Sequence, residues 1–481
     1  MTIKSARIWK IVLFSLVICG QTGVHALAQE KEQTLAFEEF LKLATERDTE
    51  FEQILIDELT LKYQKSIRLP AKDLVLSVKQ QHEFYLNQDR NSPDTTVGLS
   101  KLFPYSGTEM SLEYNAGASI SSAEKSSELT FTITQPIAEN AFGRSTRLLD
   151  KIVGLEVEVA GHQIVEAYED YLAAIIFAYY TWYEDYQNLQ IGQSSYTENQ
   201  KLLDSMKERE QQKIALPIDV NKVRLQVLSK KERVAELEEK YNSSLNIIQR
   251  IIRSEEGVTH LPQETNPMAQ IDGNFRELFK EFTVSSRTFD ILRKLENKSS
   301  LEVSRDADKL LPSINLIAGY ESSGDDYGLK HEDNILFAGI SLEWPFPDQV
   351  AKAEHAVSVI LNDKQKLATL NTYHRLYTQL MNLHLQIERE KKLIEIAEER
   401  IDLAKAILKD ESENYSFGKV TLNDYIQAFN DLDNNRFNKN SHDSQYRQLL
   451  VEWLRLNDQL VHKTETTPVI NPMCLIDSPE Q

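Results

Sequence analysis

The feature that most constrains the fold is a stretch of about 70 residues, from Gly143 to Gln212, without a proline. Apolar and aromatic side chains recur within it about every 3.5 residues, the spacing of a coiled-coil seam. These residues are Ile164, Tyr168, Tyr171, Ile175, Tyr179, Trp182, Tyr186 and Leu189. A helix of about 68 residues would be roughly 100 Å long at 1.5 Å per residue. No compact domain needs a rod of that length.

The same pattern occurs twice along the chain. After a break at "KIALPID", a second helix is predicted to about residue 253; residues 349–412 are again free of proline and glycine, and a helix from about 422 to 456 follows. Pro136 and Pro345 are 209 residues apart, and Asp219 and Asp424 are 205 apart. An extended match of this kind predicts an internal duplication. We expect a first repeat over 29–256, a linker over 257–274, a second repeat over 275–460 and a tail over 461–481.

Strand patterns precede each long helix. Leu129, Phe131 and Ile133 alternate with threonines before Gln135-Pro136, and residues 336–344 alternate in the same way before Pro345. Alternation with a period of two predicts strands, and proline ends a strand because it lacks the N–H that the ladder needs. We expect strands within about 73–135 and 313–344. Residues 95–117, with a turn sequence "YSGT", predict an additional hairpin in the first half.

The amino terminus predicts a cleaved signal peptide over residues 1–28. Basic residues precede an apolar run at 11–19, and "HALAQE" offers a small-x-small cleavage site. A membrane anchor is the alternative, but the run is well short of about 20 residues. Removing Lys4, Arg7 and Lys10 changes the formal charge from −20 to −23, which disfavours nucleic acid as a partner.

After the signal peptide, only Cys474 remains, which excludes an intramolecular disulfide and a thiolate metal cage. No later stretch approaches the length of a membrane-spanning helix, so an exported chain of this kind is periplasmic or secreted, or enters a membrane as a β-barrel. Motifs of metalloproteases, serine hydrolases and P-loop proteins do not occur, and the histidines have no ligand spacing. We therefore expect no enzymatic activity, no cofactor and no metal site.

The order of these elements resembles the TolC family of outer-membrane efflux proteins over nearly the whole mature chain. In that family each half opens with a helix that ends near Leu-Pro, and its strands end at a Gln-Pro or Trp-Pro step. The matching positions are Leu69-Pro70, Leu311-Pro312, Gln135-Pro136 and Trp344-Pro345. The periplasmic tip pattern of the family, Gly-x-x-[Ser/Thr]-x-x-Asp, is present as Gly418 to Asp424. The first half keeps only Asp219, with Lys213 where glycine is usual.

The resemblance implies a mainly α fold with a transmembrane β-barrel: a homotrimer whose strands close one barrel in outer-membrane lipid and whose helices form a long periplasmic tunnel. It implies a passive exit channel of a tripartite efflux or type I secretion system, with a periplasmic adaptor and an inner-membrane transporter as partners. Four strands per chain would give twelve in a trimer, and six would give eighteen; the sequence leaves both open. The alternative is a periplasmic coiled-coil adaptor or scaffold, although adaptors typically have one helical hairpin.

The resemblance also places a gate at the periplasmic tip, with candidate residues Asp219, Asp424, Tyr415, Gln427 and Gly418. Both aspartates lie within one turn of a predicted helix start, where a carboxylate caps the helix and is favoured by its dipole. The other interpretation is a ring of acids around a narrow entrance that binds cations. In the family, tip residues hold the entrance closed; here Val420 and Gln427 replace a basic and an acidic residue. Pro136 and Pro345 are the candidate strand-to-helix boundaries.

Overall fold

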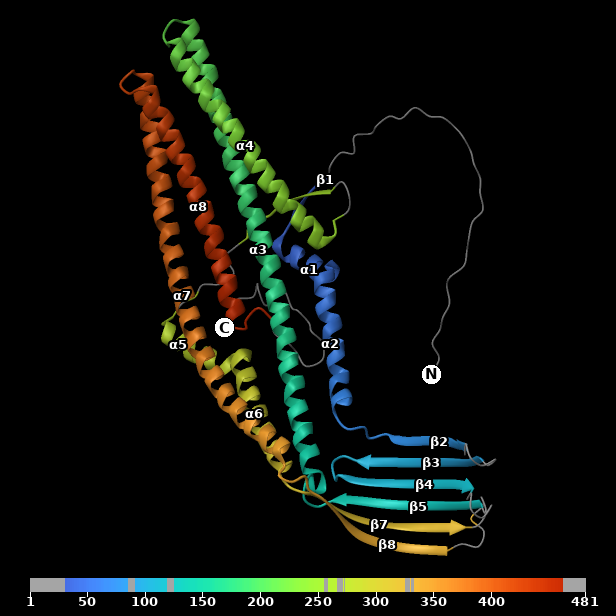
Figure 1. The fold of residues 1–481 in the computed structure, drawn as a ribbon. Helices are drawn as coiled ribbons and strands as arrows, with labels where there is room; N and C mark the ends of the chain where they lie inside the picture. The colour runs from blue at the N-terminus through green and yellow to red at the C-terminus, as the bar shows by residue number, and fades with distance from the viewer. Residues whose placement is uncertain are drawn as a thin grey trace, which may run out of the picture.

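The computed structural model describes residues 31–461 except 85–90, 119–124, 255–257, 266–270, 272, 325–328 and 330–332. The predicted signal peptide lies outside the described residues, as does the predicted tail after Val461. Within these ranges the chain is mainly helical and carries one large sheet (Figure 1). Among the described helices, none combines the length and the apolar character that crossing a bilayer requires.

The helices form two copies of one series. Two short helices of 11 residues each, α1 (Phe37–Arg47) and α5 (Phe275–Ser285), lead into α2 (Thr49–Arg68) and α6 (Arg287–Asp308). Two helices of 68 residues each follow the strands, α3 (Arg144–Gln211) and α7 (Gln349–Ser416). Each then turns into a helix of about half that length, α4 (Pro217–Ile252) or α8 (Leu422–Leu456). The long helices lie where the proline-free stretches predict them.

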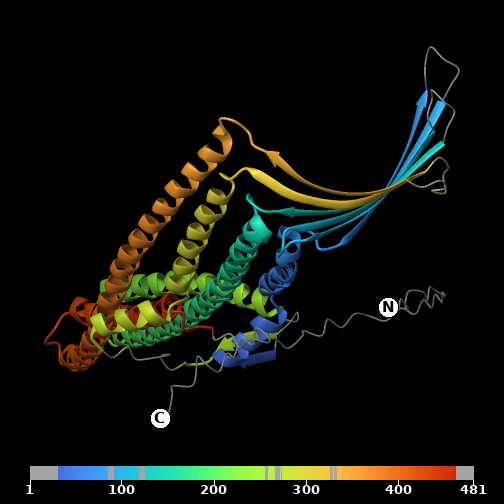
Figure 2. The same cartoon turned by 90° about the horizontal axis from the view of Figure 1, so that it is seen from below.

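The two helical hairpins α3–α4 and α7–α8 point the same way, with their turns at the end of the molecule opposite the sheet (Figure 1). Helices α2, α3, α6 and α7 pack side by side in that order and lead to the sheet, which bends away from them (Figure 2). The aromatic seam of α3 is its packing face. Tyr168, Tyr179 and Trp182 are fully buried in the main core with residues of α1 and α4.

One antiparallel sheet joins the two halves, in the order β2-β3-β4-β5-β7-β8. Its strands are β2 (Leu74–Phe84), β3 (Asn91–Phe103), β4 (Thr108–Ala118), β5 (Lys125–Pro136), β7 (Ser313–Gly324) and β8 (Asp333–Glu343). The additional hairpin predicted in the first half is β3–β4, and it is part of this sheet rather than an appendage. In the part of the chain that the structure describes, the sheet is open, with β2 and β8 as its edges.

The first described residues of the predicted linker form a strand. Val258–Pro262 forms β6, which pairs in parallel with β1 (Lys31–Leu35). Tyr179 of α3 donates its hydroxyl to the carbonyl oxygens of Leu35 and Gln263, at 3.0 and 3.1 Å. Strand β1 and the residue after β6 are therefore both bound to α3.

The two boundary prolines lie at strand ends. Pro136 is the last residue of β5, opposite Asn315 of β7, and Pro345 follows the end of β8. After Pro136 the chain makes a tight turn, η1 (Ala141–Gly143), whose flanking residue Asn140 has a positive φ of 51°. The Asn140 side chain accepts hydrogen bonds from the backbone N–H groups of Ser145 and Thr146 and so caps α3.

Candidate functional site: the helical tips and a buried ionic cluster

The two helical turns have the same backbone geometry. Gly418 ends α7 in the left-handed region, with φ of 69°, and Lys213 does the same after α3 with φ of 59°. In each turn the next residue donates its N–H to a carbonyl five positions back: Ile214 to Arg209 at 2.8 Å, and Lys419 to Asn414 at 2.9 Å. The first tip is therefore built like the second, although a lysine occupies the glycine position.

This pair of turns gives a direct prediction about stability. A Cβ at Gly418 would meet no atom within 4 Å, so only the backbone conformation resists a side chain there. We expect Gly418→Ala to lower the free energy of unfolding by about 1 kcal/mol, and Lys213→Gly to leave it unchanged or raise it slightly. Urea unfolding followed by circular dichroism measures both. An equal loss in the two variants would contradict the assignment.

The two tip aspartates occupy the same position, the third residue of a helix. Asp424 accepts hydrogen bonds from the backbone N–H and the hydroxyl of Thr421 at 3.0 and 2.6 Å, and Thr421 accepts one from the Asp424 N–H at 3.3 Å. This is a capping box, and the hydrogen bonds from Thr421 lower the pKa of Asp424. Asp219 follows Pro217 in the first turn of α4 and pairs with Lys222 at 3.5 Å.

The remaining tip candidates connect α7 and α8 to each other and to α3. Tyr415 stacks on Tyr425 and lies under the guanidinium of Arg209, 5.4 Å from the ring centre. Its hydroxyl donates to the sulfur of Met206 at 3.1 Å. Burial raises the pKa of Tyr415, and nearby Asp219 acts in the same direction while Arg209 opposes it. Gln427 donates to Asp431 at 2.8 Å, one turn along α8.

Further along α8, polar contacts tie the two hairpins together. Gln226 of α4 donates to Asn430 at 2.7 Å. One turn on, the ammonium of Lys230 lies 2.7 Å from the carboxylate of Asp433, a side chain that is 2% exposed. Ser195 of α3 donates its hydroxyl to the same carboxylate. We call Ser195, Gln226, Lys230, Asn430 and Asp433 the inter-hairpin contact.

A second charged site lies in mid-molecule and was not predicted from the sequence. Arg287, at the start of α6, has its guanidinium 2.5 Å from Glu169, 3.4 Å from Glu166 and 3.3 Å from Asp458. It also donates to the carbonyl oxygen of Val461 at 3.2 Å. Glu169 is fully buried and accepts the backbone N–H groups of Leu460 and Val461. The cluster therefore joins α3, α6 and the segment after α8.

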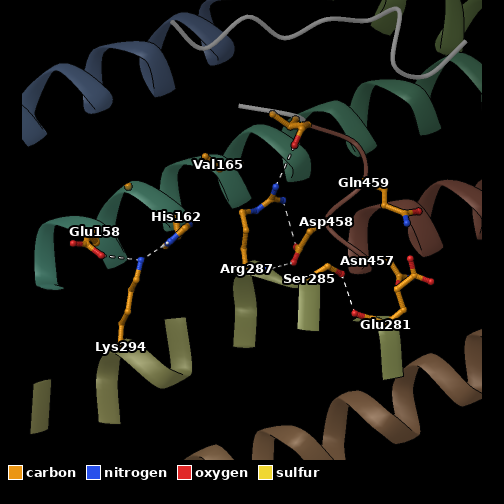
Figure 3. Close-up of a pocket in the computed structure, with 12 residues that line it drawn as sticks. Glu158, His162, Val165, Glu281, Ser285, Arg287, Lys294, Asn457, Asp458 and Gln459 are labelled. Atoms are coloured by element: carbon orange, nitrogen blue, oxygen red, sulfur yellow. Dashed lines mark hydrogen bonds and ion pairs between the residues drawn. The ribbon is translucent and has the colours of Figure 1, made fainter. Parts of the chain in front are cut away.

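The three carboxylates are close enough to share a metal ion, but Arg287 already supplies a positive charge to all three. A pocket of about 1020 Å³ opens beside this cluster, between α3, α5, α6 and the residues after α8. On its other side Lys294 lies between Glu158 and His162, at 2.8 and 3.1 Å (Figure 3). The charges of Arg287 and Lys294 on the two sides of the pocket are thus both paired with carboxylates, which is typical of a structural junction.

Burial raises the pKa of Glu169 to about 7, and the charge of Arg287 limits the increase. Because the folded protein then holds a proton that the unfolded chain loses near pH 4.5, stability from this group falls as pH rises from about 4.5 to 7. We expect the wild type to lose stability relative to Glu169→Gln between pH 5 and pH 8. Thermal unfolding of both proteins across this range tests the sign, and parallel curves would contradict it.

The architecture described above is similar to that of known proteins, although only at the level of structure. No protein-family model and no curated protein sequence matches the chain. Solved structures do match over 87% of it. They include the outer-membrane protein VceC of Vibrio cholerae (11% identity, 95% of that chain, TM-score 0.64), the outer-membrane channel CmeC of Campylobacter jejuni (12%, 85%, 0.63) and the open state of the outer-membrane channel MtrE of Neisseria gonorrhoeae (13%, 88%, 0.64). The chain therefore has the fold of outer-membrane factor channels, the fold of the TolC family.

Proposed function

We propose that this protein is the outer-membrane exit channel of a tripartite efflux or type I secretion system, and that three copies form the channel. The observation that carries the proposal is that, among the described residues, both the sheet and the helical layer end in edges without a neighbour. The sheet ends in β2 and β8, and the helical layer ends in α2 and α7. Unpaired strand edges are not tolerated in lipid, and a head-to-tail ring of copies removes them by pairing β8 of one copy with β2 of the next.

The helical edges support the same ring. Helices α2 and α7 each carry a row of apolar side chains that are at least half exposed in a single chain. They are Ile56, Leu59, Tyr63 and Ile67 on α2, and Val350, Val357, Ile360, Leu367 and Leu370 on α7. Rows of this kind are costly on a monomer and mark an interface. Contact between α7 of one copy and α2 of the next would bury both rows and continue the helical layer into a tunnel. A periplasmic adaptor and an inner-membrane transporter would supply the cargo.

The first experiment asks whether the protein is a membrane channel. We expect it to be extracted by detergent from the outer membrane, to have the mass of a trimer by light scattering, and to give steady conductance in a planar bilayer. A monomer in the soluble periplasmic fraction would contradict the proposal and would favour a scaffold or adaptor. A detergent-extracted trimer without conductance would support the trimeric assembly but contradict the channel activity.

In this proposal the helical tips form the periplasmic gate, and three copies of Asp424 and Asp219 line its entrance. Two substitutions separate the charge of Asp424 from its capping role. Asp424→Asn keeps a side-chain acceptor but removes the charge, so we expect lower cation selectivity with little loss of stability. Thr421→Ala removes the capping hydroxyl, so we expect a loss of about 1 kcal/mol with selectivity unchanged. Unchanged cation selectivity in Asp424→Asn would show that Asp424 only caps the helix.

A further inference from the structure

The hairpin β3–β4 has the same two faces as the rest of the sheet. One row of directly paired residues crosses all the strands and is apolar or aromatic throughout: Leu76, Leu99, Leu112, Phe131, Tyr320 and Leu336. Paired residues of an antiparallel sheet point to the same side. The side that would contact lipid is therefore continuous through the hairpin, which contributes Leu99 and Leu112 to it.

The opposite face is mostly polar or small through the same strands. The neighbouring row consists of Ser77, Gly98, Glu113, Thr130, Glu321 and Ile335. Glu113 belongs to β4 and lies directly between Gly98 of β3 and Thr130 of β5. Apolar residues on one face and polar residues on the other are the pattern of a barrel wall with lipid outside and water inside. A hairpin outside the wall would not need an apolar and a polar face aligned with those of the neighbouring strands.

The turn of the hairpin is fixed to the start of α3. Gly143 has φ of 74°, and a Cβ there would lie 2.5 Å from the carbonyl oxygen of Tyr105 in the turn. Arg147 donates to that same oxygen at 2.7 Å, and Gln135 donates to the carbonyl oxygen of Ser106 at 2.9 Å. These contacts hold the hairpin at the junction between sheet and helices, in line with the ends of β2 and β5.

From these observations we propose that β3–β4 is an integral part of the barrel wall, so that three copies close a barrel of eighteen strands above a ring of twelve helices. The inference rests on the proposed trimeric channel and deepens it. Each chain brings six strands of the sheet but four helices, α2, α3, α6 and α7, to the layer below. Because barrel diameter grows roughly linearly with strand number, eighteen strands give a barrel about 1.5 times as wide as twelve. Glu113 then faces the water-filled lumen in three copies.

The test uses single cysteines in a Cys474→Ser background, since the other cysteine, Cys19, lies in the predicted signal peptide. Glu113→Cys probes the lumen side of β4, and Leu112→Cys, its neighbour, probes the lipid side. Thr130→Cys on β5 is the positive control, because β5 belongs to the wall whether the barrel has twelve or eighteen strands. The readout is the cation-to-anion permeability ratio in a planar bilayer, before and after charged thiol reagents that cannot cross lipid.

We expect Glu113→Cys to lower the cation-to-anion ratio, a cationic thiosulfonate to lower it further, and an anionic one to restore it. Thr130→Cys should respond to both reagents, and Leu112→Cys to neither. A response at Thr130→Cys without one at Glu113→Cys would overturn the eighteen-stranded wall, as would a response at Leu112→Cys. The absence of conductance in all the proteins, wild type included, would instead count against the proposed channel.

Discussion

Replacing Arg287 with methionine is expected to lower the free energy of unfolding by about 3 kcal/mol at pH 8, because breaking a buried ion pair leaves an uncompensated charge. Arg287 is the positive charge that faces Glu169, which is fully buried, and it also contacts Glu166 and Asp458. At pH 5 Glu169 carries its proton, since its pKa is raised to about 7. We therefore expect a smaller loss at pH 5. Chemical unfolding followed by circular dichroism at both pH values measures the difference.

Arg293 supplies the matched control on the same helix. Its side chain is 63% exposed and lies 3.9 Å from Asp290, so Arg293→Met should cost less than about 1 kcal/mol at either pH. Arg287→Lys should also lose stability, because an ammonium cannot reach three carboxylates and a carbonyl as the planar guanidinium does. Equal losses in Arg287→Met and Arg293→Met would show that the cluster does not stabilise the junction of α3, α6 and the segment after α8.

The sequence predicts this fold well where the signal is local and repeated. The 68-residue length of α3 and its packing face follow from a proline-free stretch with heptad spacing, and Tyr168, Tyr179 and Trp182 of that seam are fully buried. The hairpin β3–β4 follows from alternation around "YSGT". In each case neighbouring residues alone determine the conformation, so no knowledge of distant segments is needed.

The sequence does not predict contacts that join distant segments. Glu169, Arg287 and Asp458 are separated by more than 100 residues each, and no local pattern marks them as partners. Glu169 lies between seam residues Tyr168 and Tyr171, but so does Asp170, which is exposed, so the sequence alone does not single out Glu169. Glu390 in α7 does give a signal: it interrupts the heptads, and in the structure it is 1% exposed and 2.8 Å from His442. An acid inside a packing face thus predicts a buried partner without naming it.

The same limit applies to the helical tips. The tip pattern identified Asp424, Tyr415 and Gly418, which lie in or beside one turn, but not the inter-hairpin contact, whose members come from three helices. Asp433 resembles any surface acid of a helix in sequence, yet it is 2% exposed. Family patterns locate the turn because residues close together in the sequence determine its backbone conformation. They do not locate the side chains that hold two hairpins together, because those depend on how the hairpins pack.

Lys230→Met is therefore expected to loosen the two hairpins at the tip. Lys230 lies 2.7 Å from Asp433, whereas the guanidinium of Arg436 lies 4.0 Å away and compensates poorly. Leaving Asp433 buried without its ammonium should cost about 3 kcal/mol. If the tips form the gate, the strain is relieved by separation of α8 from α4, which exposes Asp433 to water. We expect larger or more frequent open-channel conductance in a planar bilayer, and faster hydrogen exchange in α8.

The neighbouring lysine makes the experiment specific. Lys231 is exposed, so Lys231→Met removes the same charge from the same helix without affecting Asp433, and it should match the wild type. Adding Asp433→Leu to Lys230→Met should recover part of the stability, because an apolar pair in this position no longer buries a lone charge. Conductance should return toward the wild-type value in the double variant, since no lone buried charge is left to drive the hairpins apart. If Lys230→Met behaves like Lys231→Met in both stability and conductance, the inter-hairpin contact is not a latch.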